Sequence, residues 1–314
     1  MKTYTIGVDL GGTNIKAGLV DEAHHIVDSV SCKTNLPRPE HEVEAEIAAL
    51  CSQLAQRAGL DMATQIESVG IGTPGSVNPH TGVVEFNANF GYRNWPLVSA
   101  MEKLLPCRVY IENDANAAAY GEYIAGAAQG AKYAIAVTLG TGIGGGIILN
   151  GKVLMGAHAA AGEVSGLVSD ISKMADDDFK LTSVERYSEA PLWAGMASAS
   201  GLIFEYARQK HLPTGSPMPT GEEIFAAYNA GEPEAQKALK IFARRVAVGI
   251  LSLQNVLDVE KVAIGGGISA AEALLPAIQA ELDWLFERCT VMPTVKPELV
   301  RCRYGNDANL IGAL

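Results

Sequence analysis

The sequence is poor in cysteine, and the few cysteines follow no recognisable pattern. Five of the 314 residues are cysteine, without a Cys-x-x-Cys pair, at Cys32, Cys51, Cys107, Cys289 and Cys302. Their odd number and wide spacing argue against a disulfide-stapled scaffold, so we expect free thiols in a reducing compartment.

Basic residues and long apolar runs are also scarce. Lys and Arg total 24 against 35 Asp and Glu, which gives a formal net charge of −11. A nucleic-acid partner requires clustered Lys and Arg, so this balance argues against one. No stretch approaches the ~20 consecutive apolar residues of a transmembrane helix. The first residues run straight into an expected strand, without a signal peptide. We therefore expect a cytoplasmic protein with no membrane partner.

The chain also lacks a low-complexity linker, although its length suggests roughly two domains with a substantial core. The expected strands lie at residues 4–8, 15–20, 26–31, 69–72, 109–111, 134–137, 147–149 and 262–264. The expected helices lie at residues 42–58, 114–125, 190–210, 221–230 and 233–257, with a last helix starting at 305–308. We expect a small domain of residues 1–118, joined by a C-terminal helix at about 303–314, and a larger domain of residues 119–302.

What the sequence does contain is a glycine turn after a strand-like segment. Asp9-Leu10-Gly11-Gly12-Thr13-Asn14 follows the apolar run of residues 4–8. Such a turn lets a ligand approach the backbone, and its N–H groups and Thr hydroxyl suit phosphate oxygens. Asp9 is placed to hold a metal ion or its water. An ordinary hairpin loop is the alternative interpretation of this segment alone.

Two more glycine turns favour the phosphate interpretation. Leu139-Gly140-Thr141-Gly142 lies between two expected strands, and Gly265-Gly266-Gly267 follows a third. Turns in equivalent places of successive halves indicate a duplicated fold that holds one nucleotide between its lobes.

Two other glycine patterns fail on their context. Gly140-x-Gly142-x-x-Gly145 fits the dinucleotide fingerprint, but β-favouring residues follow where that fingerprint needs a helix. Gly146-x-x-x-x-Gly151-Lys152 resembles a P-loop, but Val153 stands where a P-loop has the hydroxyl that binds magnesium.

Taken together, the motifs resemble those of the ROK family of sugar kinases over essentially the whole chain. In chain order they are Asp9-Leu10-Gly11-Gly12-Thr13-Asn14, Gly72-Thr73-Pro74-Gly75, Glu112-Asn113-Asp114-Ala115-Asn116-Ala117-Ala118, Leu139-Gly140-Thr141-Gly142-Ile143-Gly144, Gly162-Glu163, Ile264-Gly265-Gly266-Gly267 and Gly305-Asn306-Asp307-Ala308. The resemblance implies the duplicated α/β fold of the actin-like (ribonuclease H-like) ATPases, with an active-site cleft between two lobes. It also implies a homodimer that uses ATP and Mg²⁺ to phosphorylate a sugar.

The nucleotide would contact both lobes. The expected nucleotide-binding residues are Gly11, Gly12 and Thr13 at the terminal phosphates, Thr141 and Gly142 on the other lobe, and Gly265 and Gly266 further out. Asp9 would hold magnesium, directly or through water.

Asp114 is the expected catalytic base. A sugar hydroxyl is a poor nucleophile, so phosphoryl transfer benefits from a carboxylate that accepts its proton. Asp114 follows a short strand and opens an alanine-rich helix, at a strand end where side chains meet ligands. The alternative is that Asp114 is only the N-cap of that helix.

The resemblance also supplies an expected sugar site. Its residues are Gly75, where a ring can approach the backbone, Asn89, Asn113, Asp114 and Glu163. Asn89 matches the family's Asn upstream of a Trp, with Asn87 as the alternative alignment. Glu163 matches a sugar-binding Glu, with a solvated loop acid as the alternative.

The chain departs from the family where zinc-containing members continue Glu-x-Gly-His and then carry a cysteine cluster. Here Gly166 stands at the His position, and no cysteine occurs between Cys107 and Cys289. A structural zinc site needs about four N or S ligands, so we expect none. The segment of residues 166–200, with Met174-Ala175-Asp176-Asp177-Asp178, replaces the zinc module. The pattern looks closer to zinc-lacking members such as β-glucoside kinases.

Two other functions compete with that of a hexose or glucoside kinase. A sugar-responsive repressor would need an N-terminal DNA-binding domain, but the phosphate turn already begins at Asp9 and the charge is unfavourable. A non-catalytic sugar-binding or chaperone-like ATPase would share the fold. Asp114 beside Asn113, together with Glu163, favours catalysis.

Overall fold

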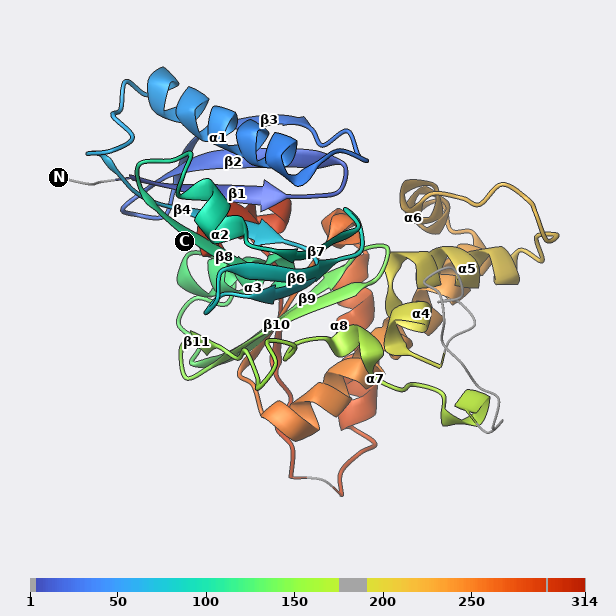
Figure 1. Ribbon diagram of the computed structural model, residues 1–314. Coiled ribbons are helices and arrows are strands. Elements are labelled where there is room, and N and C mark those ends of the chain that lie inside the picture. The colour runs from blue at the N-terminus through green and yellow to red at the C-terminus, as the bar shows by residue number, and fades with distance from the viewer. Residues whose placement is uncertain (1–3, 175–190, 292, 314) are drawn as a thin grey trace. The chain divides into compact units, whose positions relative to one another are not determined.

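The computed structural model describes residues 4–174, 191–291 and 293–313, which form an α/β structure (Figure 1). The described strands build two five-stranded sheets and one three-stranded sheet. The chain divides into two compact units: residues 1–130, 146–162 and 303–314 form the first, and residues 131–145 and 163–302 form the second. The boundary near residue 118 stays a prediction, because compactness does not by itself define a folding domain.

The first unit is built on a sheet with the strand order β3-β2-β1-β4-β8. Its strands are β1 (Tyr4–Leu10), β2 (Asn14–Asp21), β3 (Ile26–Lys33), β4 (Ile66–Thr73) and β8 (Arg108–Asn113). The first three strands form an antiparallel meander, as the sequence predicts, whereas β4 and β8 run parallel to β1. Parallel strands end at the same edge of a sheet, so Asp9, the 11–13 turn and Asp114 lie at one edge of this one.

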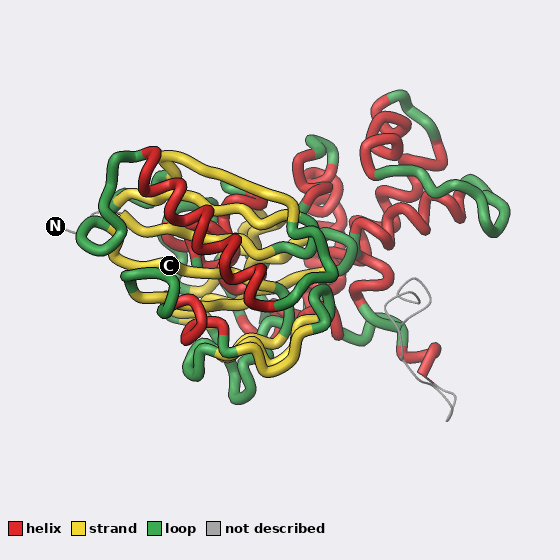
Figure 2. The backbone as a smooth tube through the Cα atoms, turned by 45° about the horizontal axis from the view of Figure 1, so that its top comes forward, coloured by secondary structure: helices red, strands yellow, loops and turns green. Residues whose placement is uncertain are grey.

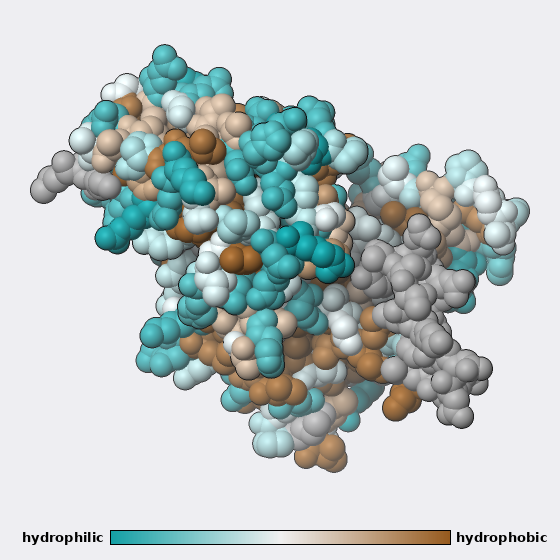
Figure 3. Space-filling view, viewed as in Figure 1, coloured by the Kyte–Doolittle hydropathy of each residue, from teal (hydrophilic) through white to brown (hydrophobic). Residues whose placement is uncertain are grey.

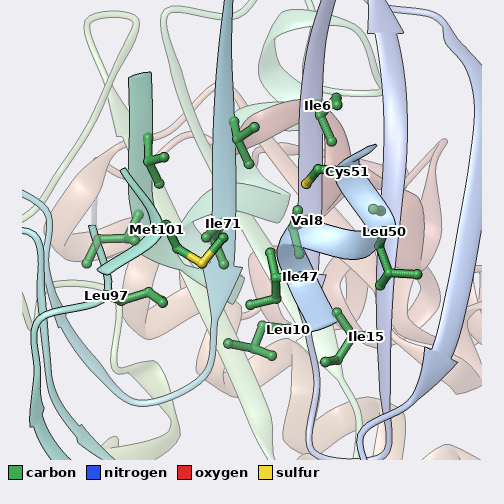
Figure 4. Packing of buried hydrophobic residues seen from close by; sticks show 14 of the residues in the cluster. Ile6, Val8, Leu10, Ile15, Ile47, Leu50, Cys51, Ile71, Leu97 and Met101 are labelled. Atoms are coloured by element: carbon green, nitrogen blue, oxygen red, sulfur yellow. The ribbon is translucent and has the colours of Figure 1, made fainter. Parts of the chain in front are cut away.

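Helix α1 (Glu40–Arg57) covers one face of this sheet, and Figure 2 shows it crossing the strands obliquely. Val43, Ile47, Leu50 and Leu54 are buried at helical spacing. Figure 4 shows Ile47 and Leu50 beside labelled core side chains of β1 and β2. Burying a side chain of this size stabilises the fold by about 1.5–3 kcal/mol.

Helix α3 (Asp114–Ile124) and the short C-terminal helix α9 (Ala308–Gly312) pack together beside the sheet. α9 approaches β1 and β4 so closely that a Cβ on Gly7 would lie 1.8 Å from the Leu310 carbonyl oxygen. A Cβ on Gly72 would lie 1.9 Å from Asn309 Oδ1. Gly7 and Gly72 therefore leave the space that α9 occupies.

The structure also contains a small antiparallel sheet, β5-β6-β7, whose strands the sequence does not predict. Its strands are β5 (Ser76–Asn78), β6 (Val83–Asn87) and β7 (Tyr92–Trp95), and the short helix α2 (Leu97–Met101) follows. Trp95 is fully buried, and its Nε1–H donates to Glu44 Oε1 at 2.7 Å. This hydrogen bond links β7 to α1.

The second sheet has the order β11-β10-β9-β12-β13. Its strands are β9 (Tyr133–Leu139), β10 (Ile143–Leu149), β11 (Lys152–Val153), β12 (Lys261–Gly265) and β13 (Glu298–Arg301). The segment after Gly142 is a strand and Lys152 follows a hairpin turn, so neither the dinucleotide fingerprint nor the P-loop is formed.

The helices of the second unit agree with the sequence except around Ser198 and at α8. They are α4 (Trp193–Ala197), α5 (Ala199–Gln209), α6 (Gly221–Asn229), α7 (Pro233–Leu257) and α8 (Leu274–Phe286). The single helix expected at 190–210 is two helices, because the Ser198 side chain accepts from Gly201 N–H and starts a new one. α8 has no counterpart among the expected helices.

Hydrophilic and hydrophobic residues are intermixed over the face seen in Figure 3. No helix in the described part of the chain has the length and apolar character to span a bilayer.

Candidate active site

The motifs that begin at Asp9, Gly72 and Glu112 lie at one edge of the first unit's sheet. Asp9 pairs in register with Gly72, and Thr73 pairs with Asn113. Because β1, β4 and β8 are parallel, the segments that follow them leave the sheet on the same side. The turn of residues 11–13 joins β1 to β2 as a tight hairpin, with Gly11 N–H donating to Asn14 O at 3.0 Å. The hairpin and phosphate interpretations are therefore compatible.

The Asp9 carboxylate is held by the C-terminal helix. Asn309 Nδ2 donates to Asp9 Oδ1 at 2.7 Å, and Asn309 Oδ1 is buried without a hydrogen-bond partner in the structure. Asn309 is not among the residues expected from the sequence, although the motif of residues 305–308 beside it marked the segment. Lys16, opposite Asp9 in the β1–β2 register, forms an ion pair with Asp307.

The pKa of Asp9 is raised to about 6, chiefly by burial and next by the charge of Asp114, whereas the bond from Asn309 and the charge of Lys16 lower it. A half-buried carboxylate with free acceptor capacity suits magnesium, which is usually held through one or two protein carboxylates and the phosphates of the substrate. The chemistry of Asp9 therefore fits this ion. The influence of Asp114 also places the two carboxylates within electrostatic reach.

Asn113, and not Asp114, is the N-cap of α3. Asn113 Oδ1 accepts from the backbone N–H groups of Ala115 and Asn116 at 3.0 and 3.2 Å. Asn113 Nδ2 donates to Gly75 O at 3.1 Å. The alternative that made Asp114 the cap is therefore wrong, and Asn113 has a structural role that the sequence did not indicate. Asp114 is the first residue of the helix, where a negative charge is favourable.

The structure separates the two candidate asparagines of the 86–92 segment. Asn87 is fully buried: its Nδ2 donates to Thr73 Oγ1 at 3.2 Å, and its Oδ1 accepts from the N–H groups of Asn89 and Phe90. Asn89 is exposed, and its Cβ lies 3.4 Å from where a Cβ of Gly12 would be. Asn87 thus shapes the loop, and Asn89 lies beside the 11–13 turn with its side chain accessible.

Gly75 has φ +104°, and a Cβ there would lie 2.2 Å from the Phe86 carbonyl oxygen. Only glycine fits such a position without strain. Its backbone is exposed, as the expected approach of a sugar ring requires.

In the second unit the other two glycine turns lie together. β9 and β12 are parallel, with Gly265 paired to Thr138, so both turns follow the carboxyl ends of adjacent strands. Gly266 has φ +87°, and a Cβ there would lie 2.4 Å from the Leu139 carbonyl oxygen. Thr141 is exposed, and no atom lies within 4 Å of the Cβ position of Gly142. A phosphate-sized group has room at this turn.

A cavity of about 810 Å³ adjoins the second of these turns, at Gly267. It lies between the start of α6 and the 3₁₀ helix of residues 267–270, and among its lining residues are Thr220, Gly221, Phe225, Gly267, Ile268 and Ala271. Its side chains are mainly apolar, which suits a flat aromatic ring. Apart from the glycine turn on one side of it, no sequence pattern indicates this cavity.

Glu163 is exposed, and its side chain makes no capping bond to the 3₁₀ helix Val164–Gly166. Nothing lies within 4 Å of a Cβ on Gly166, so the position that the resemblance pairs with the His of zinc-containing members is open. The choice between a sugar ligand and a solvated acid at Glu163 stays a prediction.

Within the described residues, no group of three or more His, Cys, Asp or Glu side chains is arranged to hold a metal ion. Residues 175–190, which include the middle of the segment expected to replace the zinc module, lie outside the described part. All five cysteines are free thiols, as expected.

Similarity to known proteins identifies the family. The profile of the ROK family matches residues 5–314. The glucokinase of Halalkalibacterium halodurans is 32% identical over 98% of this chain and 93% of its own length, and the β-glucoside kinase of Klebsiella pneumoniae is 26% identical over 98% and 93%. The structure of a ROK glucokinase from Streptomyces griseus, in complex with glucose and AMPPNP, aligns with a TM-score of 0.77 and 31% identity over 99% of this chain and 97% of that one. Identity to these relatives does not favour the β-glucoside kinase over the glucokinases.

Proposed function

The chain belongs to the ROK family and is an ATP-dependent carbohydrate kinase, and we propose that it phosphorylates O6 of a hexose or hexoside with Asp114 as general base. The observation that carries this proposal is the shared sheet edge of the first unit. There Asp9 lies near the end of β1, the 11–13 turn follows β1 and Asp114 follows β8, and the charge of Asp114 acts on Asp9.

Each of these groups has one task in the transfer. The Gly12 backbone N–H and the Thr13 hydroxyl bind the terminal phosphates, and Asp9 binds Mg²⁺ directly or through water. The magnesium ion neutralises charge that develops on the phosphates when it is bound. Asp114 accepts the proton of the attacking hydroxyl. Asn113, through its cap and its bond to Gly75 O, fixes the first turn of α3 and with it the backbone of Asp114.

The second unit supplies the rest of the nucleotide site in this proposal. Thr141 and Gly142 bind phosphate, Gly265 and Gly266 line the approach, and the apolar cavity beside Gly267 takes the adenine ring. Asn89, Asn113 and Glu163 hydrogen-bond sugar hydroxyls, and Gly75 lets the ring approach the backbone. We propose a homodimer that contains no structural zinc.

Replacement of Asp114 tests the base. Asp114→Asn keeps the shape of the side chain but removes its basicity, so we expect kcat to fall by about 10²–10⁴-fold while glucose binding stays measurable by calorimetry. Asp61→Asn, at an exposed loop carboxylate of the same unit, is the control and should retain wild-type kcat. Near-normal kcat in Asp114→Asn would refute the assignment.

The alternative is a non-catalytic sugar-binding or regulatory member of the same fold. It would bind a hexose without phosphorylating any sugar in the presence of Mg-ATP. A coupled ADP-release assay with the wild-type protein separates the two.

A further inference from the structure

Thr34 lies directly after β3 and is fully buried beside the phosphate turn. Its hydroxyl donates to the Gly11 carbonyl oxygen at 2.7 Å, and its backbone N–H donates to the Thr13 carbonyl oxygen at 2.9 Å. Thr34 thus holds the carbonyl groups of both Gly11 and Thr13, the two ends of the turn that the proposed function assigns to the phosphates.

The orientation of these carbonyls decides where the turn points its donors. In a planar trans peptide the C=O and the following N–H point in opposite directions. With its carbonyl directed at Thr34, the Gly11–Gly12 peptide must direct the Gly12 N–H away from Thr34. Two adjacent glycines have unusual backbone freedom, so this direction is not set by the turn sequence itself.

We propose that Thr34 is a positioning residue of the phosphate turn, which aims the Gly12 N–H at a phosphate oxygen of the nucleotide. The inference rests on the proposed function, because it takes the turn of residues 11–13 as the phosphate site. The exposed Asn89 side chain lies beside the same turn, with its Cβ 3.4 Å from where a Cβ of Gly12 would be.

Two variants separate the hydroxyl from the rest of the side chain. Thr34→Val keeps the shape and the backbone donor but leaves Gly11 O without its hydroxyl partner, whereas Thr34→Ser keeps the hydroxyl. Loss of one aimed donor weakens phosphate binding by up to about tenfold. We expect Thr34→Val to raise the KM for Mg-ATP and the Kd for its non-hydrolysable analogue by about this factor, with Thr34→Ser within about twofold of wild type.

Ile47→Val is the matched control, because Ile47 is equally buried in the same unit but contacts the core beneath α1. It should lower the Tm without changing the Kd for the analogue. An unchanged Kd in Thr34→Val, or an equal rise in Ile47→Val, would overturn the positioning role.

The calorimetric Kd for the analogue needs no acceptor and no catalytic base. A wrong assignment of Asp114 or of the sugar therefore leaves this test intact. Conversely, an active kinase whose Thr34→Val variant binds the analogue like wild type would refute only the role of Thr34.

Discussion

Asn113 and Asp114 are adjacent, and each is a good N-cap by residue type. The sequence alone therefore offers either residue as the start of α3. The structure decides because Asn113 has the extended backbone of a cap, whereas Asp114 already has helical geometry. The same limit applies to Asn87 and Asn89, since burial against Thr73 depends on strands distant in sequence. Chemistry at a motif is predictable from its residues, but the division of tasks among neighbours depends on backbone conformation.

At the residue scale, Asp9 should lower the stability of the protein in exchange for metal binding. Its pKa is raised from 3.8 to about 6, mainly by burial. The folded state therefore binds a proton more tightly than the unfolded state between these values. The stabilising effect of that proton is full below pH 3.8 and is lost as the pH rises through about 6.

Asp9→Asn should consequently raise the free energy of unfolding at pH 7.5, by up to about 3 kcal/mol, because Asn has no charge to desolvate. Its Oδ1 still accepts from Asn309. The advantage should shrink as the pH falls towards 4, and kinase activity should be lost at every pH. Urea unfolding of wild type and variant without Mg²⁺, between pH 4 and 8, measures the difference. A constant difference across this range would contradict the electrostatic origin.

At the scale of elements, the periodic segments are predictable and the short ones are not. α1 has apolar residues at helical spacing, and α7 continues such a pattern from Pro233 to Leu257. β5, β6 and β7 are three to five residues long, too short for a strand period to stand out. They form because Trp95 and Val84 are buried against the first unit's core. Such tertiary burial is invisible to a local pattern.

The packing of α9 on the sheet makes a coupled prediction. Gly72→Ala would place a methyl group 1.9 Å from Asn309 Oδ1, so we expect a loss of about 1–3 kcal/mol in the free energy of unfolding. Asn309→Ala removes the obstructing amide. The double variant should therefore be more stable than the sum of the two single effects, which a double-mutant cycle measures.

The Mg²⁺ requirement of the kinase should not change in parallel with the free energy of unfolding among these variants. Asn309→Ala and the double variant both lack the donor to Asp9, so the Mg²⁺ concentration for half-maximal activity should rise in both. Additive stabilities would show that the methyl and the amide do not compete for the same space. An unchanged Mg²⁺ requirement would show that the bond to Asp9 has no influence on the metal.

At the scale of the whole molecule, the repeated glycine turns predict the duplicated architecture from the sequence alone. Each unit has a glycine turn directly after a strand that is central in its sheet, β1 in one and β9 in the other. Only glycine fits at positions 75 and 266, so these motifs reflect the backbone geometry as well as the expected ligand contacts. The apolar cavity beside Gly267 is not predictable in this way, because it is formed by α6 and a 3₁₀ helix from separate parts of the chain.

The metal content of the purified protein can be predicted from the whole sequence. The sequence lacks the cysteine cluster expected of zinc-containing members, and Gly166 stands where the resemblance places their His. We expect the purified kinase to require Mg²⁺ and to contain no stoichiometric zinc, which elemental analysis measures. About one zinc per chain would contradict this prediction.

The acceptor sugar is the property of the molecule that the sequence leaves most open. Asn89, Asp114 and Glu163 suit the hydroxyls of a pyranose, whereas the open position at Gly166 removes a polar partner. A site that lacks such a partner discriminates weakly against substituted rings, because no buried group is left unpaired. We expect 6-phosphorylation with modest preference among glucose-like hexoses and tolerance of substituents at C1 or C2.

A panel of glucose, fructose, mannose, allose, N-acetylmannosamine and cellobiose, each with Mg-ATP, measures this tolerance as kcat/KM. Gly166→His is the informative variant, since it introduces the imidazole of the zinc-containing members at an unobstructed position. It should lower kcat/KM for cellobiose relative to glucose, because the added ring occupies space that the second sugar would use. Strict glucose specificity in the wild type, with cellobiose inert, would contradict the enlarged site and leave the kinase assignment standing.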